Sequence, residues 1–203
     1  MTRLLFIRHA AIDGLGQRIA GRGPGNPLNR QGRAQAEQLA RHLSAQKIAA
    51  IYTSPQARTV ETADALALRA GIAPLPTAEL DELDFGAWTG RSYTELHELP
   101  DWHRFNKVRS FTRMPGGELL LEVQSRVIAC ADRLRRIHDG KTIALVSHGD
   151  VIRAALLFYL GAPLDAMLRL EISPASISTL LLDDDSARIL EINRTVPSAE
   201  EVS

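Results

Sequence analysis

Short apolar runs alternate along the chain with segments whose apolar residues recur every three or four positions. The runs at 3–7, 49–53 and 142–146 predict buried β-strands, and a further short strand is predicted near 74–77. Helical spacing predicts α-helices over about 29–44, 54–71 and 118–137, with another that starts at 150. Because strands and helices alternate, we expect a three-layer α/β domain with a largely parallel sheet.

Residues at the helix ends support these boundaries. Asn29 is a good N-cap for the first helix, and Ser54–Pro55 combines a capping residue with a first-turn proline. Gly71 is predicted to end the second helix, since glycine commonly follows a helix C-terminus. Ser92 and Glu95 have the spacing of a capping box, which predicts a short helix at this point.

The stretch from 80 to 117 is irregular, and within it 91–117 is predicted to be a lid-like insertion. Its mixture of aromatic and basic side chains fits a substrate lid or plain packing, and fits a nucleic-acid surface less well: Trp102, His103, Phe105, Lys107, Arg109, Phe111 and Arg113. Near the C-terminus, 177–182 and 188–192 predict a hairpin that turns at 183–185. Residues from about 195 to 203 are predicted to form a polar tail.

The composition fits a single globular domain over residues 1–203. The chain is 45% hydrophobic and 24% charged, which is ordinary for a folded protein and excludes disordered and fibrous classes. With 24 Lys and Arg against 24 Asp and Glu, the net charge of zero argues against a broad nucleic-acid or membrane surface. A net charge of zero is still compatible with a local cluster of positive charge.

The sequence also favours a cytoplasmic location. The single cysteine, Cys130, cannot form an internal disulfide, which fits a reducing compartment. The apolar run at 4–7 is too short for a signal peptide, and the longest run, 154–160, is too short to span a membrane. Because 154–160 fits either a core or an interface, homodimer formation is left open.

Cationic and titratable side chains follow three of the predicted strands. The first strand ends at Arg8-His9, the second leads to Ser54-Pro55 and Arg58, and the fourth ends at Ser147-His148-Gly149. The carboxyl ends of parallel strands meet at one edge of a sheet, where ligands bind. Positively charged side chains repel one another, so a cleft that brings several of them together is expected to bind an anion. We therefore expect an anion-binding site at this edge.

Short motifs follow one another in a familiar order along nearly the whole chain. They are Arg8-His9-Ala10, Pro27-Leu28-Asn29-x-x-Gly32-x-x-Gln35-Ala36, Ser54-Pro55-x-x-Arg58-x-x-x-Thr62-Ala63, Leu80-x-Glu82-x-x-Phe85-Gly86-x-Trp88-x-Gly90, Pro115-Gly116-Gly117-Glu118 and Val146-Ser147-His148-Gly149. This series resembles the histidine phosphatase (phosphoglycerate-mutase-like) superfamily. The resemblance implies a three-layer α/β/α sandwich with a mostly parallel mixed sheet.

The resemblance also implies roles for the residues in these motifs. His9 would be the nucleophile that forms a phosphohistidine, and neutral imidazole is available near pH 7 because its reference pKa is about 6.5. Arg8 and Arg58 would bind phosphoryl oxygens through their planar guanidinium groups. His148, if cationic, would add positive charge, and the amide of Gly149 could donate another hydrogen bond.

Glu82 would protonate the leaving oxygen and then deprotonate the attacking water. It lies in an acidic stretch, so Asp81 and Asp84 are rival acids, and a solvated acidic loop is the plain alternative.

The chain departs from the family pattern at several positions. Alanine at position 10 replaces the usual glycine, and Leu119 occupies a position where serine is common. No asparagine occurs at the usual spacing after the first histidine, which leaves Gln17 as a stand-in. A simple turn is favoured for 21–25, with Arg18 or Arg22 as candidates to line the mouth of the site.

The resemblance implies a metal-independent phosphatase that acts on a small phosphorylated metabolite and uses no cofactor. Two alternatives are a cofactor-dependent phosphoglycerate mutase and a non-catalytic module that binds a phosphorylated ligand. Chain length favours the phosphatase, because mutases of this fold usually carry a longer insertion around the lid. Neither a nucleic acid nor a membrane is expected as a partner. The substrate is not determined by the sequence.

Overall fold

A six-stranded mixed sheet forms the centre of the computed structural model, which describes residues 1–197. The strands are β1 (Thr2–Arg8), β2 (Ile48–Thr53), β3 (Leu75–Pro76), β4 (Thr142–Ser147), β5 (Ile177–Leu182) and β6 (Ala187–Arg194). Their order is β3-β2-β4-β1-β5-β6. The first four strands are parallel to one another, β5 pairs antiparallel with β1, and β6 pairs antiparallel with β5. This confirms the α/β prediction, including the mostly parallel sheet and the terminal hairpin.

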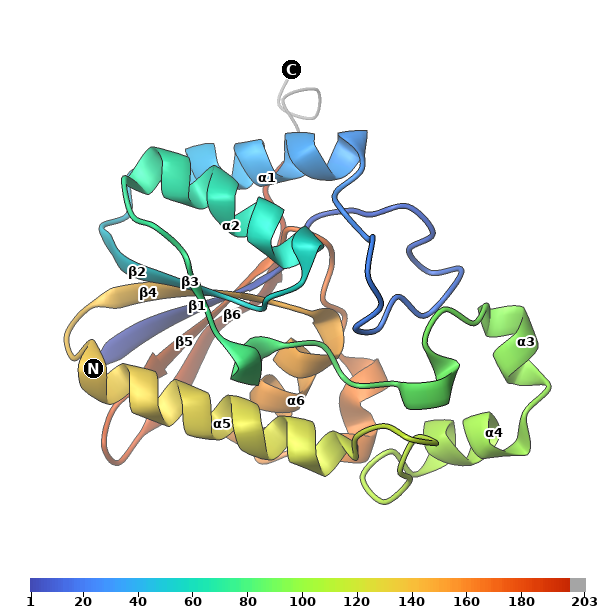
Figure 1. The fold of residues 1–203 in the computed structure, drawn as a ribbon. Coiled ribbons are helices and arrows are strands. Elements are labelled where there is room, and N and C mark those ends of the chain that lie inside the picture. The colour runs from blue at the N-terminus through green and yellow to red at the C-terminus, as the bar shows by residue number, and fades with distance from the viewer. Residues whose placement is uncertain (198–203) are drawn as a thin grey trace.

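Helices cover both faces of the sheet (Figure 1). The helices α1 (Arg30–Leu43) and α2 (Ala57–Ala70) lie on one face, and α5 (Leu120–Ile137) and α6 (Gly149–Tyr159) lie on the other. Successive side chains of a strand point to opposite faces. Accordingly, Leu5 and Ile7 of β1 join the core under α1 and α2, whereas Leu4 and Phe6 join the core under α5 and α6. This arrangement is the predicted three-layer sandwich.

The predicted helix ends are correct at three points and wrong at one. The Asn29 side chain accepts a hydrogen bond from the amide of Gly32, Gly71 follows α2 with a φ of 68°, and Ser92 forms its capping box with Glu95. However, α2 begins at Ala57 rather than at Ser54–Pro55. The Ser54 hydroxyl accepts a long hydrogen bond, 3.4 Å, from the amide of Gln56, which is the N-cap of α2, and also bonds to side chains of the site described below.

The segment predicted as a lid is built from two short helices, α3 (Tyr93–His97) and α4 (Pro100–Lys107), and α4 was not predicted. Trp102 and Phe105 of α4 are buried, and their rings lie 5.4 Å and 5.5 Å from that of Trp88. These aromatic side chains therefore pack in the core, as the plain-packing alternative requires. Short 3₁₀ helices occupy Ala78–Leu80, Gly86–Trp88 and Leu164–Arg169.

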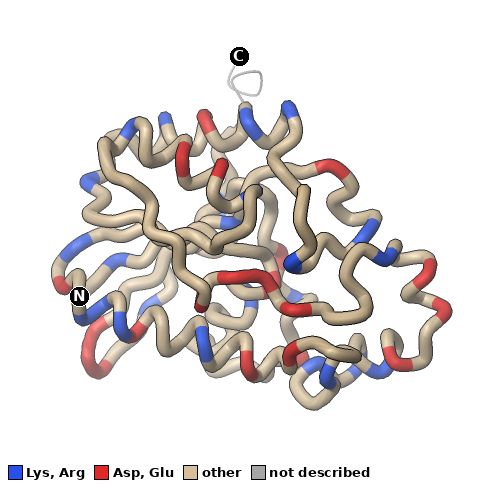
Figure 2. The backbone as a smooth tube through the Cα atoms, in the orientation of Figure 1, with Lys and Arg blue, Asp and Glu red and all other residues tan. Residues whose placement is uncertain are grey.

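Charged residues of both signs lie interspersed on the helices and loops around the sheet, whereas 142–149 and 172–182 carry none (Figure 2). Within the apolar run at 154–160, Leu156 and Leu157 are buried, whereas Phe158 and Leu160 are exposed. Within residues 1–197, no helix combines the length and apolar character needed to cross a membrane. Most of the predicted polar tail, from 198 onwards, lies outside the described residues.

Candidate active site

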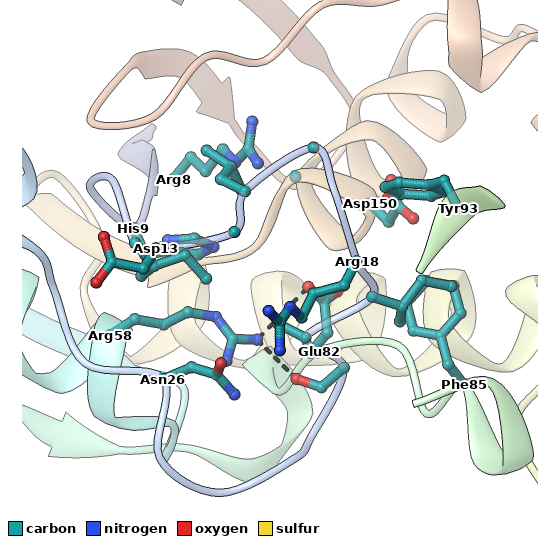
Figure 3. Close-up of a pocket in the computed structure, with 18 of the residues that line it drawn as sticks. Arg8, His9, Asp13, Arg18, Asn26, Arg58, Glu82, Phe85, Tyr93 and Asp150 are labelled. Atoms are coloured by element: carbon teal, nitrogen blue, oxygen red, sulfur yellow. Dashed lines mark hydrogen bonds and ion pairs between the residues drawn. The ribbon is translucent and has the colours of Figure 1, made fainter. Parts of the chain in front are cut away.

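The carboxyl ends of β1, β4 and β2 bring three predicted site segments together. His9 follows β1, His148 follows β4 and Ser54 follows β2, and the three strands are neighbours in the sheet. The rings of His9 and His148 lie 5.3 Å apart. A pocket of about 470 Å³ opens at this edge, and Arg8, His9, Arg58 and Glu82 line it (Figure 3).

His9 is buried at the inner end of this pocket, with 3% of its surface exposed. Its Nδ1 lies 2.8 Å from the carbonyl oxygen of Ala10, which can only accept, so Nδ1 carries the proton and Nε2 carries a lone pair. Burial, followed by the charges of Arg58 and Arg8, lowers the pKa of His9 well below its usual value. The ring is therefore neutral near pH 7 and has the protonation state that a nucleophile needs.

Two arginines flank this histidine, and a backbone carbonyl anchors each of them. Arg8 Nη1 donates to the oxygen of Ile172 at 2.5 Å, and Arg58 Nη2 donates to the oxygen of Gly21 at 2.8 Å. The Nε atoms of both arginines are buried and have no hydrogen-bond partner within residues 1–197. A buried donor without a partner is costly, so these guanidinium groups retain unsatisfied capacity for an anion.

His148 is fully buried and lies behind the pocket lining rather than in it. Its Nδ1 lies 3.1 Å from Arg58 Nη2, which can only donate, and its Nε2 lies 2.8 Å from Ser54 Oγ. The proton of His148 therefore resides on Nε2. Burial, followed by the charge of Arg58, lowers the pKa of His148 well below its usual value.

The condition under which His148 would add positive charge is therefore not met. In this structure the ring is neutral near pH 7 and accepts a hydrogen bond from the Arg58 guanidinium, because a charged ring would place two donors against each other. The positive charge near His9 comes from the arginines. His148 orients one of them.

Glu82 lines the pocket together with two other acidic residues, Asp13 and Asp150 (Figure 3). Its Oε2 lies 3.7 Å from Arg58 Nη2, and 14% of the side chain is exposed. Burial is the main cause that raises the pKa of Glu82 to about 7, against the opposing effect of Arg58. A carboxyl group with a pKa near the working pH can both donate and accept a proton.

The rival acids are engaged elsewhere and lie outside the pocket lining. The Oδ1 atom of Asp81 accepts hydrogen bonds from the side chains of Ser54 and Gln56 and from the amide of Glu82. Asp84 accepts a hydrogen bond from the amide of Gly86. The geometry favours Glu82 as the acid over both neighbours.

The remaining predicted residues divide into two groups. Gly149 and Arg18 line the pocket, whereas Gln17 and Arg22 lie outside its lining. Gly149 is the first residue of α6, so its amide has no partner within the helix. A Cβ atom at this position would lie 3.4 Å from Arg8 Nε, so the absence of a side chain leaves room for the guanidinium group.

Arg22 occupies a different position from the mouth predicted for it. Its Nη2 donates to Glu118 Oε2 at 2.8 Å, and its Nε donates to the carbonyl oxygen of Glu82 at 2.8 Å. The sequence placed Arg22 in a glycine-rich turn, where a ligand contact is plausible. The guanidinium group also forms ion pairs with Asp81 Oδ2 at 3.4 Å and with Asp84 Oδ2 at 3.8 Å. These carboxylates are all distant in sequence, so only the folded structure shows that Arg22 is paired.

Several pocket residues were not predicted from the sequence. Asn26 lines the pocket where Gln17 was expected to do so, at a spacing from His9 that the family pattern did not suggest. Further lining residues with polar or aromatic side chains are Asp13, Phe85, Tyr93, Asp150 and Arg153. Asp150 and Arg153 could have been found from the sequence, because they fall in the first turns of the helix that follows His148. Tyr93 is the residue of the predicted lid that reaches the pocket.

The site combines two arginines, a neutral histidine and a carboxyl group whose pKa is raised to about 7. Within the described residues, no group of three or more His, Cys, Asp or Glu side chains is placed to hold a metal ion.

Comparison with known proteins shows the family of this chain. The sequence profile of the histidine phosphatase superfamily (branch 1) matches residues 4–195. The chain is 30% identical over 200 residues to phosphoserine phosphatase 1 of Hydrogenobacter thermophilus, covering 96% of this chain and 93% of that protein. It is 29% identical over 205 residues to the probable phosphoglycerate mutase GpmB of Salmonella choleraesuis, covering 100% of this chain and 94% of the relative.

A longer relative and a solved structure extend the comparison. The chain is 33% identical over 198 residues to the bifunctional protein Rv2228c of Mycobacterium tuberculosis, covering 96% of this chain but only 54% of that protein. The structure of YhfR from Bacillus stearothermophilus superposes with a TM-score of 0.90 at 25% identity, covering 96% of this chain and 98% of that one.

Proposed function

The chain belongs to branch 1 of the histidine phosphatase superfamily, and from this premise we propose that it hydrolyses small phosphomonoesters through a phosphohistidine on His9. One observation carries the proposal: a neutral histidine with a free Nε2 lies beside Arg8, Arg58 and a carboxyl group whose pKa is raised to about 7. These groups match a nucleophile, the ligands of a phosphoryl group and a proton donor.

In the first step, the Nε2 lone pair of His9 attacks phosphorus and forms a P–N bond. The P–O bond to the leaving group breaks, and the leaving oxygen takes the proton of Glu82. Arg8 and Arg58 stabilise the charge on the remaining phosphoryl oxygens throughout the transfer. The step ends with phosphohistidine, a free alcohol and ionised Glu82.

In the second step, water attacks the phosphorus of phosphohistidine. The Glu82 carboxylate accepts a proton from this water, the P–N bond breaks, and its electron pair returns to Nε2 of His9. Inorganic phosphate leaves, and both His9 and Glu82 regain their starting protonation states. The two steps together consume one ester and one water.

The size of the activation barrier explains why several catalytic groups are needed. Phosphomonoester hydrolysis is among the slowest uncatalysed reactions, so the enzyme lowers the barrier by about 20 kcal/mol or more. Proton donation by a group such as Glu82 supplies roughly 3–5 kcal/mol. The larger part must come from positioning, from the covalent route and from the fixed positive charges of the arginines.

A small phosphorylated metabolite is the proposed substrate class, because a pocket of about 470 Å³ admits a phosphoryl group and a small leaving group. The phosphatase activity named for the 30% identical relative supports hydrolysis. The mutase named for the 29% identical relative supports a second candidate, in which a substrate hydroxyl rather than water receives the phosphoryl group.

Hydrolysis of an aryl phosphate in the presence of EDTA tests this proposal. We expect turnover that depends on His9 and needs no added metal. Turnover no greater than that of His9→Ala would contradict the enzyme proposal, and loss of activity in EDTA would contradict metal independence. A separate assay with a phosphoglycerate and its bisphosphate primer distinguishes the mutase, and isomerisation faster than hydrolysis would overturn the preference for a phosphatase.

A further inference from the structure

Two segments that are distant in sequence pack backbone to backbone beside the active site. The acid loop (residues 81–87) carries Glu82, and residues 115–118 lie just before α5. The amide of Glu118 donates to the oxygen of Asp84 at 2.9 Å, and the amide of Ala87 donates to the oxygen of Pro115 at 2.8 Å. These bonds fix residues 115–118 to the acid loop.

Glycine is required at two positions of this contact. A Cβ atom on Gly117 would lie 2.2 Å from the oxygen of Asp84, and one on Gly86 would lie 2.2 Å from the oxygen of Pro115. Both distances are too short for any side chain, and Gly86 also has a φ of 51°. The two glycines therefore allow residues 115–118 to approach the loop closely enough for the side chain of Glu118 to reach it.

The carboxylate of Glu118 binds three donors through a single oxygen. Its Oε2 accepts from the amide of Asp84 at 3.0 Å, from Arg22 Nη2 at 2.8 Å and from Arg126 Nη2 at 3.3 Å. With 21% of its side chain exposed, Glu118 is mostly shielded from water. The carboxylate thus holds together two guanidinium groups that would otherwise repel each other.

Both of these arginines also reach the backbone of the proposed acid. Arg22 Nε donates to the carbonyl oxygen of Glu82 at 2.8 Å, and Arg126 Nη2 donates to the same oxygen at 3.1 Å. Arg22, Arg126 and Glu118, which we call the carboxyl clamp, lie outside the pocket lining. The clamp therefore contacts the backbone of Glu82 and leaves its carboxyl group to face the pocket.

We propose that the carboxyl clamp is a positioning device for Glu82, which holds the proton donor at the correct distance from the leaving oxygen. The inference rests on the proposed function, because it assumes that Glu82 donates the proton. Contacts to the backbone fix the position of the residue without pairing its carboxyl group with a charge. The charges that act most on the pKa of Glu82 are those of Arg58 and Asp150, which are not clamp residues.

The variant Glu118→Gln tests the clamp, because it removes the charge and keeps the shape. A displaced acid should matter for alkyl phosphates, whose leaving groups need a proton, and matter little for nitrophenyl phosphate, whose leaving group does not. We expect kcat for an alkyl phosphate to fall by about 10- to 100-fold, and kcat for nitrophenyl phosphate to fall by less than about threefold. Arg22→Gln should show the same pattern.

Glu122→Gln is the matched control. Glu122 lies in the first turn of α5, four residues after Glu118, is half exposed, and pairs with Arg113 rather than with the clamp. It should leave both activities unchanged. Thermal unfolding of each variant establishes that the fold is intact, and Arg126→Lys, which keeps the charge and one donor, supplies a second, milder clamp variant.

A combined variant separates positioning from a general structural role. If the clamp acts through Glu82, Glu118→Gln should cause no further loss of alkyl phosphatase activity in a Glu82→Gln background. An equal loss with both substrates, an unchanged alkyl phosphate rate, or additive losses in the combined variant would overturn the inference. If Glu82→Gln alone shows no dependence on the leaving group, the acid assignment itself fails, which is a distinct result.

Discussion

The Nδ1 atom of His9 lies 2.8 Å from the carbonyl oxygen of Ala10, the next residue in the chain. This contact determines which ring nitrogen can react, because it leaves the lone pair on Nε2. The amide of Ala10 in turn donates to Thr62 Oγ1 at 3.1 Å, which ties this backbone to α2. Within the described residues, Ala10 is not among those with a positive φ, so the backbone does not require a glycine at this position.

The activity should depend on pH through Glu82. Because the pKa of Glu82 is raised to about 7, the proton needed by the leaving group is lost as the pH rises above that value. The kcat for an alkyl phosphate should therefore fall about tenfold per pH unit on the alkaline side. Nitrophenyl phosphate should show a weaker alkaline limb, and Glu82→Gln should abolish that limb. If kcat still falls at alkaline pH in Glu82→Gln, another group causes the fall and the prediction is contradicted.

The free energy of unfolding should also depend on pH through the carboxyl group of Glu82. The pKa of Glu82 is higher in the folded than in the unfolded chain, so its contribution to stability is lost as the pH rises through the folded value. Ionised Glu82 should cost up to about 3 kcal/mol above about pH 7. Glu82→Gln should therefore raise the free energy of unfolding at about pH 8.5 more than at about pH 5, as measured by urea denaturation. A gain that is the same at both pH values would contradict the burial argument.

Ser54→Ala should impair catalysis although Ser54 does not line the pocket. Its hydroxyl accepts the Nε2 proton of His148 at 2.8 Å and donates to Asp81 Oδ1 at 3.1 Å. Removal leaves a buried N–H without a partner at a cost of about 1–3 kcal/mol, and the ring that orients Arg58 is no longer held. We expect kcat for nitrophenyl phosphate to fall by roughly tenfold. The exposed Ser125→Ala on α5 is the control, and an unchanged rate in Ser54→Ala would contradict the orienting role.

Arg58→Lys should be far more harmful than the same change at the mouth of the pocket. Arg58 Nη2 donates to the oxygen of Gly21 and to Nδ1 of His148, while its Nε has no partner within residues 1–197. A lysine cannot supply all these donors from one plane. We expect kcat/KM to fall by about 100-fold in Arg58→Lys and by only a few-fold in the exposed Arg18→Lys. A loss of only a few-fold in Arg58→Lys would show that the positive charge alone is sufficient and would contradict this prediction.

The fold and the centre of the site could be predicted because both depend on local patterns. Buried strands and amphipathic helices are visible in the apolar periodicity, and the parallel sheet follows from their alternation. Residues such as His9 and His148 directly follow strands, so the sheet edge that they share was implied by the sequence. The family motifs then pointed to Arg8, His9, Arg58 and Glu82, which line the pocket.

Other features depended on contacts between distant residues. Ser54 looked like a helix cap, but its hydroxyl is used by His148 and Asp81, and the helix begins later. Arg22 looked like a ligand of phosphate, but its partner Glu118 lies on another segment. The aromatic residues of α4 are equally typical of a lid and of a core. Only their packing against Trp88 in the folded structure distinguishes the two.

The most direct test is to trap the intermediate on His9. The protein should be mixed with an excess of phosphorylated substrate in EDTA, quenched in alkali and analysed by peptide mass spectrometry. We predict a phosphoryl group on His9 that survives alkali and is lost in acid, and that is absent from His9→Ala. A phosphoryl group on another residue or on His9→Ala, or rapid turnover with no detectable phosphohistidine under any quench, would contradict the account.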